Sequence, residues 1–136
     1  PNWLVALEER LAFLESYGYL QRFRYGEHLK VRRRIENVSG SLVIPLSLQM
    51  LVENAIKHNE VSANHPLDIE IASTGGKYIT VRNTLNRKDL VEHSSGTGLD
   101  NLRKQIRFFS VDPLVVEEEG GFFTVRIPIF QSVDLQ

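Results

Sequence analysis

Residues 48–59 read Leu-Gln-Met-Leu-Val-Glu-Asn-Ala-Ile-Lys-His-Asn and combine an apolar and a polar side of one helix. The apolar residues recur at the spacing that packs a helix on a core, namely Leu48, Leu51, Val52, Ala55 and Ile56. Asn54, Lys57 and His58 share the other side. An amide oxygen is a hard ligand for Mg²⁺, an ammonium attracts phosphate, and an imidazole can donate a hydrogen bond. The stretch fits a metal and polyphosphate site, and it fits an ordinary amphipathic helix with a solvated face equally well.

Residues 95–103, Ser-Gly-Thr-Gly-Leu-Asp-Asn-Leu-Arg, form a second candidate site. Gly96 and Gly98 precede a run of apolar residues at helical spacing, namely Leu99, Leu102, Ile106 and Phe109. A glycine loop at a helix N-terminus lets backbone N–H groups approach an anion closely. The stretch matches neither Gly-x-Gly-x-x-Gly after a strand nor the Gly-Lys-Ser/Thr of a P-loop. A flexible loop with a helix cap is therefore the other interpretation.

Together the two stretches resemble the ATP-binding domain of the gyrase, chaperone and histidine kinase superfamily, and most of all the LytS-like sensor histidine kinases. That family has a Pro-x-x-x-Leu-Gln-x-Leu-Val-Glu-Asn-Ala-x-Lys-His run followed by Gly-x-Gly-Leu-x-Asn-x-Arg. The first run is matched by Pro45, Leu48, Gln49, Leu51, Val52, Glu53, Asn54, Ala55, Lys57 and His58. The second is matched by Gly96, Gly98, Leu99, Asn101 and Arg103. Residues 8–29 look like the second helix of the family's dimerisation region, and residues 123–128 resemble its final strand.

The resemblance implies an α+β fold. We expect a two-layer α/β sandwich of the Bergerat type, with a mixed, mostly antiparallel sheet, helices on one face and a long N-terminal helix in front. Residues 1–27 would be the C-terminal part of the dimerisation helix region, and residues 28–136 the ATP-binding catalytic domain. The hydrophobic periods and glycine turns predict a helix over 3–25, strands over 29–38, 67–73, 77–85, 114–119 and 122–130, and helices from the two motif stretches.

The resemblance also assigns roles to residues, with ATP and Mg²⁺ as cofactors. Asn54 would hold Mg²⁺, Lys57 and His58 would contact the phosphates, and Asn83 would face adenine. The phosphate loop would comprise Gly96, Thr97, Gly98 and Leu99, and residues 86–97 would form a charged loop that acts as a lid over the nucleotide. The catalytic candidates are Glu53, Lys57 and His58. The reaction would transfer the γ-phosphoryl group to a histidine outside this fragment, mainly by positioning and charge neutralisation.

The sequence departs from the superfamily pattern at three points. Asn83 stands where an Asp followed by two glycines is usual, and a neutral amide makes a weaker hydrogen bond than a carboxylate. Met50 occupies a position where an acid or Asn is common, and Glu53 lies about 100° around the helix from Asn54. No acceptor-histidine segment of the Pro-His-Phe type is present. A degenerate interaction module with weak or no nucleotide binding is therefore the alternative, and an ATP-hydrolysing enzyme is a third, weaker one.

The composition is that of one globular domain. Of the 136 residues 42% are hydrophobic, and 16 basic against 17 acidic residues give a net charge of −1, so no attraction to nucleic acid is implied. The absence of cysteine excludes disulfide bonds and thiolate metal sites. No apolar run reaches the ~20 residues that span a bilayer, and no signal peptide is present. Because the chain opens Pro1-Asn2-Trp3 without Met, we expect a fragment of a longer protein.

The resemblance implies partners as well. The full-length protein would be a homodimer through the N-terminal helix, whose broad apolar face predicts packing onto something outside this chain. Its other partner would be a cognate response regulator. We expect no nucleic acid and no direct membrane contact for this fragment, which would be the cytoplasmic domain of a bacterial inner-membrane sensor.

Overall fold

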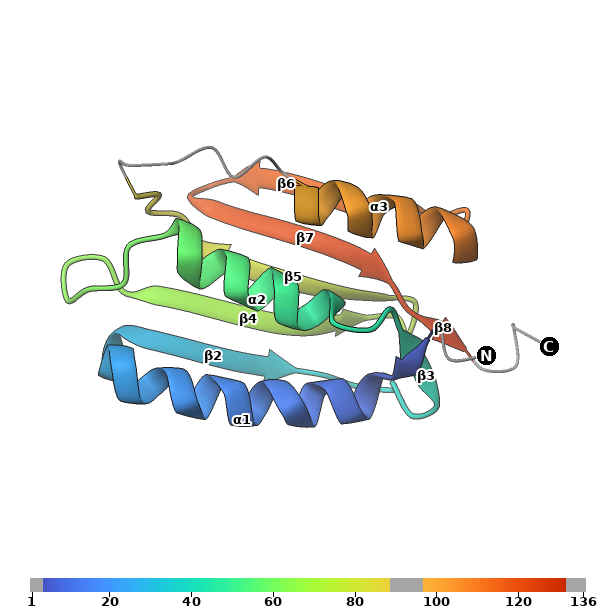
Figure 1. Ribbon diagram of the computed structural model, residues 1–136, viewed down its shortest axis with the longest axis horizontal. Coiled ribbons are helices and arrows are strands. Elements are labelled where there is room, and N and C mark those ends of the chain that lie inside the picture. The colour runs from blue at the N-terminus through green and yellow to red at the C-terminus, as the bar shows by residue number, and fades with distance from the viewer. Residues whose placement is uncertain (1–3, 89–96, 132–136) are drawn as a thin grey trace.

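The computed structural model describes residues 4–88 and 97–131. In chain order the elements are β1 (Val5–Ala6), α1 (Leu7–Tyr25), a 3-10 turn η1 (Gly26–His28), β2 (Leu29–Arg34), β3 (Ser41–Val43), α2 (Ser47–His58), β4 (Leu67–Thr74), β5 (Tyr78–Thr84), α3 (Thr97–Phe109), β6 (Val115–Glu119), β7 (Phe122–Pro128) and β8 (Phe130–Gln131). Figure 1 shows α1, α2 and α3 running side by side along one sheet. No helix in the described part of the chain is long and apolar enough to cross a membrane.

The main sheet has five strands in the order β2-β4-β5-β7-β6. The β2–β4 pair is parallel and the other pairs are antiparallel, so the sheet is mixed and mostly antiparallel, as predicted. Two tight turns join β4 to β5 and β6 to β7. Gly75 and Gly76 (φ 60° and 70°) and Gly120 and Gly121 (φ 61° and 83°) occupy them in the left-handed region that favours glycine.

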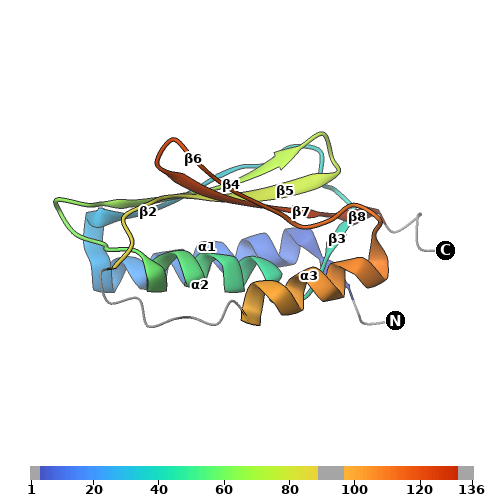
Figure 2. The ribbon, with the colours of Figure 1, turned by 90° about the horizontal axis from the view of Figure 1, so that it is seen from above.

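The three helices cover a single face of this sheet, which makes the molecule a two-layer sandwich (Figure 2). Alternate strand residues point into the layer between helices and sheet, and the most buried of them are Leu29, Leu67, Ile69, Ile71, Ile79, Val81, Val125 and Ile127. From the helices come Leu48, Leu51, Val52, Ala55 and Ile56 of α2, the residues whose spacing predicted a core-facing helix. The predicted fold class is thus confirmed.

Helix α1 is part of the same hydrophobic core. Leu7, Leu11 and Leu14 are 0%, 2% and 3% exposed and belong to the cluster that contains the strand residues. Gly18 faces β2, and a Cβ there would make an ordinary van der Waals contact with Val31, 3.7 Å from its Cβ. The predicted boundary between residues 27 and 28 therefore does not divide the core, and α1 is a structural element of the sandwich.

A small second sheet, in the order β1-β3-β8, was not predicted from the sequence. Ala6 pairs with Leu42, and Leu42 pairs with Phe130, so this sheet ties the start of α1 to the last described strand. As a result α1 begins at Leu7 rather than at residue 3. The predicted strand over 29–38 is also shorter and ends at Arg34.

Candidate functional site

Helix α2 presents the three polar residues of the first motif away from the core. Its buried stripe faces the sheet, and Asn54 and His58 are partly exposed while Lys57 is exposed. Asn54 lies one turn before His58, on the side of α2 that also carries Met50. The structure therefore brings Asn54, Lys57 and His58 to one accessible face, the arrangement that the sequence predicted.

The segment that follows β5, residues 86–88, lies against the end of α2. Asn59, only 3% exposed, donates from Nδ2 to the carbonyl oxygen of Ala55 at 2.9 Å. Its Oδ1 accepts from the backbone N–H of Asn86, also at 2.9 Å. The backbone N–H of Glu60 donates to the carbonyl oxygen of Asn86 at 2.7 Å, and that of Lys88 donates to the carbonyl oxygen of His58 at 3.1 Å. These four bonds fix the start of the predicted lid beside the polar face of α2.

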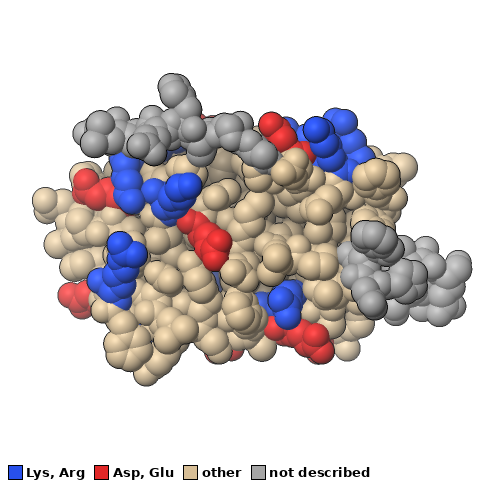
Figure 3. All heavy atoms as spheres, viewed as in Figure 1, with Lys and Arg blue, Asp and Glu red and all other residues tan. Residues whose placement is uncertain are grey.

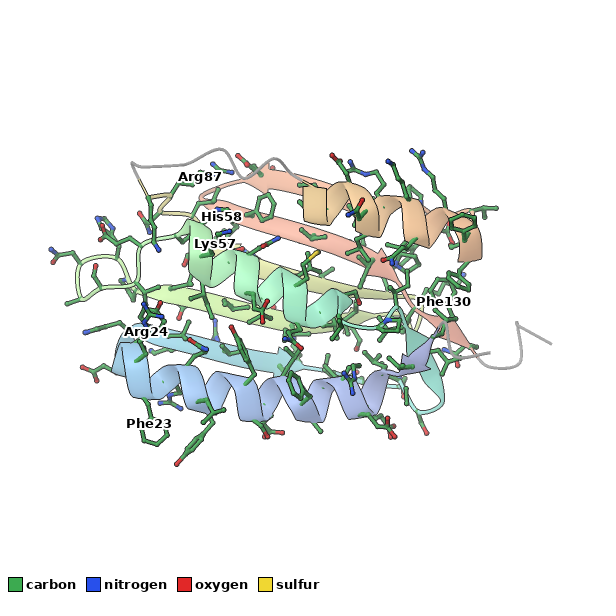
Figure 4. All side chains as sticks on the ribbon, in the orientation of Figure 1. Phe23, Arg24, Lys57, His58, Arg87 and Phe130 are labelled. Atoms are coloured by element: carbon green, nitrogen blue, oxygen red, sulfur yellow. The ribbon has the colours of Figure 1, made fainter. Side chains whose placement is uncertain are left out.

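Positive charge gathers at this end of α2. Burial lowers the pKa of His58 from its ordinary value of 6.5, and the nearby charges of Lys57, Lys88 and Arg87 lower it further. Figure 4 shows Lys57, His58 and Arg87 together at the end of α2, and Figure 3 shows basic side chains clustered at that end of the helix-bearing face. Burial and these cations both favour the neutral imidazole, which has one donor and one acceptor.

The N-terminus of α3 borders the same face of α2. A Cβ placed on Gly98 would lie 3.0 Å from Sδ of Met50, which is one turn before Asn54. Only a residue without a side chain fits there unless Met50 shifts. Leu99 anchors this end by packing against the core. The first-turn N–H groups of an α-helix have no partner within the helix, so those of α3 are suited to an anion. Gly96 and the side chain of Thr97, both predicted to line the phosphate loop, lie outside the described residues.

Asn83 lies on β5 and on the sheet face that the helices cover. It alternates with Ile79 and Val81, and it is 3% exposed. Its Nδ2 donates to the carbonyl oxygen of Thr84 at 2.8 Å, which fixes the orientation of the amide. Since Asn86, three residues later, bonds to Asn59, the end of β5 lies beneath the last turn of α2. Asn83 therefore lies near the end of α2 that carries Asn54, Lys57 and His58.

Glu53 lies on a different side of α2 from the other candidates. Its Oε1 accepts from Nε2 of Gln49 at 2.9 Å. Its charge also reaches α1, because the pKa of Tyr17 is raised, first by burial and then by Glu53. The structure thus places Glu53 toward α1, whereas Met50 and Asn54 border α3.

A metal ion at this site would need ligands of a particular kind. No group of three or more His, Asp or Glu side chains suited to a metal occurs in the part of the chain that the structure describes. The amide oxygen of Asn54 is a hard ligand of the type that Mg²⁺ accepts, and Mg²⁺ commonly completes its octahedron with phosphate oxygens and water. The donor set therefore fits a Mg²⁺ ion that arrives with a phosphate ligand, and does not fit a metal held by protein alone.

Three residues of this region were missed from the sequence, namely Asn59, Arg87 and Lys88. Nothing in the local pattern distinguishes Asn59 from a helix-ending residue, because its partner Asn86 is remote in sequence. The adjacent cations Arg87 and Lys88 directly after a strand were the one available signal. Arg87 forms an ion pair with Glu118 of β6, which ties the segment to the sheet edge as well.

Comparison with solved structures shows which known fold this chain shares. The catalytic domain of the histidine kinase ThkA superposes with a TM-score of 0.60 at 16% identity, over 92% of this chain and 94% of that one. The fold is accordingly that of a histidine kinase catalytic domain. That match covers nearly the whole of both chains.

Comparison of sequences shows distant relatives among sensor histidine kinases. The chain is 33% identical over 121 residues to the sensor protein LytS of Staphylococcus saprophyticus, covering 77% of this chain and 20% of LytS. It is 29% identical over 143 residues to the sensor histidine kinase YesM of Bacillus subtilis, covering 96% of this chain and 25% of YesM. No family model matches the sequence. The chain is thus a distant homologue of the LytS and YesM sensor histidine kinases, and it spans between a fifth and a quarter of their length.

Proposed function

We propose that this chain is the ATP-binding catalytic domain of a two-component sensor histidine kinase, which transfers the γ-phosphoryl group of ATP to a histidine outside these residues. The observation that carries the proposal is the polar face of α2. Asn54, Lys57 and His58 lie on it between the N-terminus of α3 and the cationic segment 86–88, in a fold shared with histidine kinase catalytic domains.

Each group has a role that its chemistry supports. Asn54 would supply an oxygen ligand to Mg²⁺, which when bound neutralises phosphate charge. Lys57 and His58 would bind phosphate oxygens, and the N–H groups after Gly98 would bind others. Asn83, beneath the end of α2, would accept from the amino group of adenine through Oδ1, since Nδ2 is engaged by Thr84. Positioning and charge neutralisation of this kind are most of what phosphoryl transfer requires.

Glu53 could transfer a proton at this site only if its side chain broke the hydrogen bond with Gln49 and turned toward Asn54. In its described position it accepts from Gln49 and lies toward α1, so it does not share the face that Asn54 and His58 form. An acid at position 50 would lie one turn before Asn54, but that residue is Met50. The arrangement therefore favours transfer to a strong nucleophile such as a histidine over activation of water.

The partners follow from the same proposal. A sensor kinase transfers its phosphoryl group to a cognate response regulator. The full-length protein would dimerise through its N-terminal helical region. This chain would be the cytoplasmic domain of an inner-membrane sensor. The outer side of α1 supports a protein contact, because it exposes a row of large apolar side chains, namely Phe13, Tyr19, Leu20 and Phe23. Sedimentation of Phe23→Ser beside the parent tests that contact, and unchanged self-association would exclude this surface.

The alternative is an interaction module that uses this α1 surface and binds nucleotide weakly or not at all. One experiment separates the two functions. In calorimetric titrations, Mg-ATP should bind with a Kd in the micromolar to low millimolar range, and excess EDTA should weaken the binding strongly. An absence of binding at millimolar Mg-ATP would reject the kinase proposal in favour of the interaction module.

A further inference from the structure

The segment 86–88 carries two cations to the end of α2, and they differ in what surrounds them. Arg87 is ion-paired with Glu118. Among the described residues, no carboxylate forms an ion pair with Lys88 or with Lys57. Both lysines lie close enough to His58 to lower its pKa, so the described part of the chain brings two ammonium groups, neither ion-paired within it, to one imidazole. The positive charges of Lys57 and Lys88 disfavour a further positive charge on His58. An anionic ligand would relieve this repulsion, so the three side chains together suit an anion.

The backbone of Lys88 has a structural role that its side chain does not share. Its N–H caps the carbonyl oxygen of His58, the last residue of α2. Any residue other than proline supplies that N–H, so the cap leaves the ammonium unexplained. The Lys88 side chain is exposed. Its backbone is bonded to His58, the residue after Lys57, so the side chain starts beside the α2 face that holds Asn54.

Asn59 contributes the side-chain part of the contacts that hold this segment on α2. Its buried amide donates to the carbonyl oxygen of Ala55 and accepts from the N–H of Asn86. Both polar atoms are used, and no shorter side chain spans the two partners. The amide of Asn59 therefore acts together with the backbone bonds of Glu60 and Lys88 to set the position of Lys88 relative to Lys57.

We propose that Lys88 is a phosphate-binding residue of this domain and that Asn59 is the residue that positions it. This inference rests on the proposed nucleotide site. The ligand would be a polyphosphate chain, and Lys57 of α2 and Lys88 of segment 86–88 would both bind its oxygens. Arg87 contributes less, because Glu118 already neutralises it.

The test compares nucleotides that differ in phosphate number. Calorimetric titrations with Mg-ATP and with AMP are run on the parent, on Lys88→Ala and on Lys77→Ala. Lys77 is the matched control, because it is an exposed lysine at the opposite end of β5. Loss of one charge-assisted contact corresponds to about tenfold in affinity. Lys88→Ala should weaken Mg-ATP binding by about tenfold and AMP binding by less than about twofold, whereas Lys77→Ala should change neither.

The role of Asn59 is tested by a double-mutant cycle. Asn59→Ala should lower the ratio of ATP to AMP affinity about as much as Lys88→Ala does, and should lower it little further in the Lys88→Ala background. A merely structural role would weaken both nucleotides alike and leave their ratio unchanged. Asn59→Ser, which is too short to hold both partners, replaces Asn59→Ala if that variant does not fold, and the Lys88→Ala result stands independently of both.

The possible outcomes distinguish a failure of the Lys88 proposal from a failure of the proposed nucleotide-binding function. If the parent binds Mg-ATP and Lys88→Ala binds it equally well, the inference is wrong and the proposed function stands. If the parent does not bind Mg-ATP, the proposed function fails first. If the effects of Asn59→Ala and Lys88→Ala simply add, and Asn59→Ala weakens Mg-ATP and AMP binding equally, Lys88 remains a phosphate-binding residue and Asn59 does not position it.

Discussion

Asn83→Asp tests how the end of β5 is built and whether it faces adenine. The substitution keeps the shape of a side chain that is 3% exposed but replaces an amide that donates to the carbonyl oxygen of Thr84 at 2.8 Å. Both carboxylate oxygens are acceptors, so the bond is lost and a negative charge is brought against a carbonyl oxygen. We therefore expect the variant to fold with reduced stability at neutral pH.

The magnitude follows from the lost bond. Leaving a buried acceptor without its donor costs about 1–3 kcal/mol, and for a domain of this size each kcal/mol lowers the midpoint of thermal unfolding by roughly 4 °C. Burial should also raise the pKa of the new carboxyl above its ordinary value of about 3.9. The folded state then binds the proton more readily than the unfolded state, so stability is lost as pH rises through the raised pKa and returns near pH 4.

The assay is urea unfolding followed by circular dichroism at pH 4.5 and pH 7.5, with and without Mg-ATP. Asn64→Asp, at an exposed loop position, is the control for the charge change. Without ligand, Asn83→Asp should lose more stability than Asn64→Asp at pH 7.5 and less at pH 4.5. With ligand, a carboxylate that accepts from adenine should give a larger Mg-ATP stabilisation than the parent, and a stronger preference for ATP over GTP. Equal stability of the two variants would refute the buried-amide reasoning, and an unchanged nucleotide response would place Asn83 outside the adenine pocket.

Three further predictions concern other parts of the chain. Leu7→Ala should lower the free energy of unfolding by about 2–5 kcal/mol because Leu7 is fully buried, whereas Leu20→Ala, 63% exposed, should change it by less than about 0.5 kcal/mol; similar losses in urea unfolding would show that α1 is not part of the core as described. Phosphate beside His58 should raise its lowered pKa, so Mg-ATP binding should take up protons and tighten as pH falls from 8 to 6; calorimetry in two buffers of different ionisation enthalpy measures this, and His58→Gln should abolish it. Incubation with γ-labelled ATP should leave the chain unlabelled, because no segment resembles the family's acceptor helix; a stable label on any of its histidines would contradict this.

Much of the fold was visible in local patterns. The apolar spacing of α2 and α3 and the paired glycines of the two hairpins reflect constraints that act within a few residues, so the sequence displays them directly. The small β1-β3-β8 sheet was missed because its strands are two or three residues long and form only through partners remote in sequence. The parallel β2–β4 pair also depends on a crossover that local patterns do not reveal.

Helix α1 shows a different limit. Its sequence carries apolar residues on two opposite sides, and only the structure shows that the Leu7, Leu11 and Leu14 side packs on the sheet while the side with Leu20 and Phe23 is exposed. The candidate site divides in the same way. One helical face predicted the grouping of Asn54, Lys57 and His58, but the contribution of Asn59 and Lys88 arises from contacts between segments about thirty residues apart, which no local spacing encodes.

In the proposed function, the polar face of α2 holds Mg-ATP through Asn54. The most direct measurement is the Mg-ATP affinity of Asn54→Ala beside that of Asn64→Ala, an exposed asparagine outside the site, by calorimetry at saturating Mg²⁺. Asn54→Ala should weaken binding by at least about tenfold, the equivalent of losing one ligand of the Mg²⁺ ion that binds the phosphates. Asn64→Ala should leave the affinity unchanged, and both variants should keep the circular dichroism spectrum of the parent, because Asn54 lies on the side of α2 away from the core. An Asn54→Ala protein that folds and binds Mg-ATP as tightly as the parent would contradict the claim.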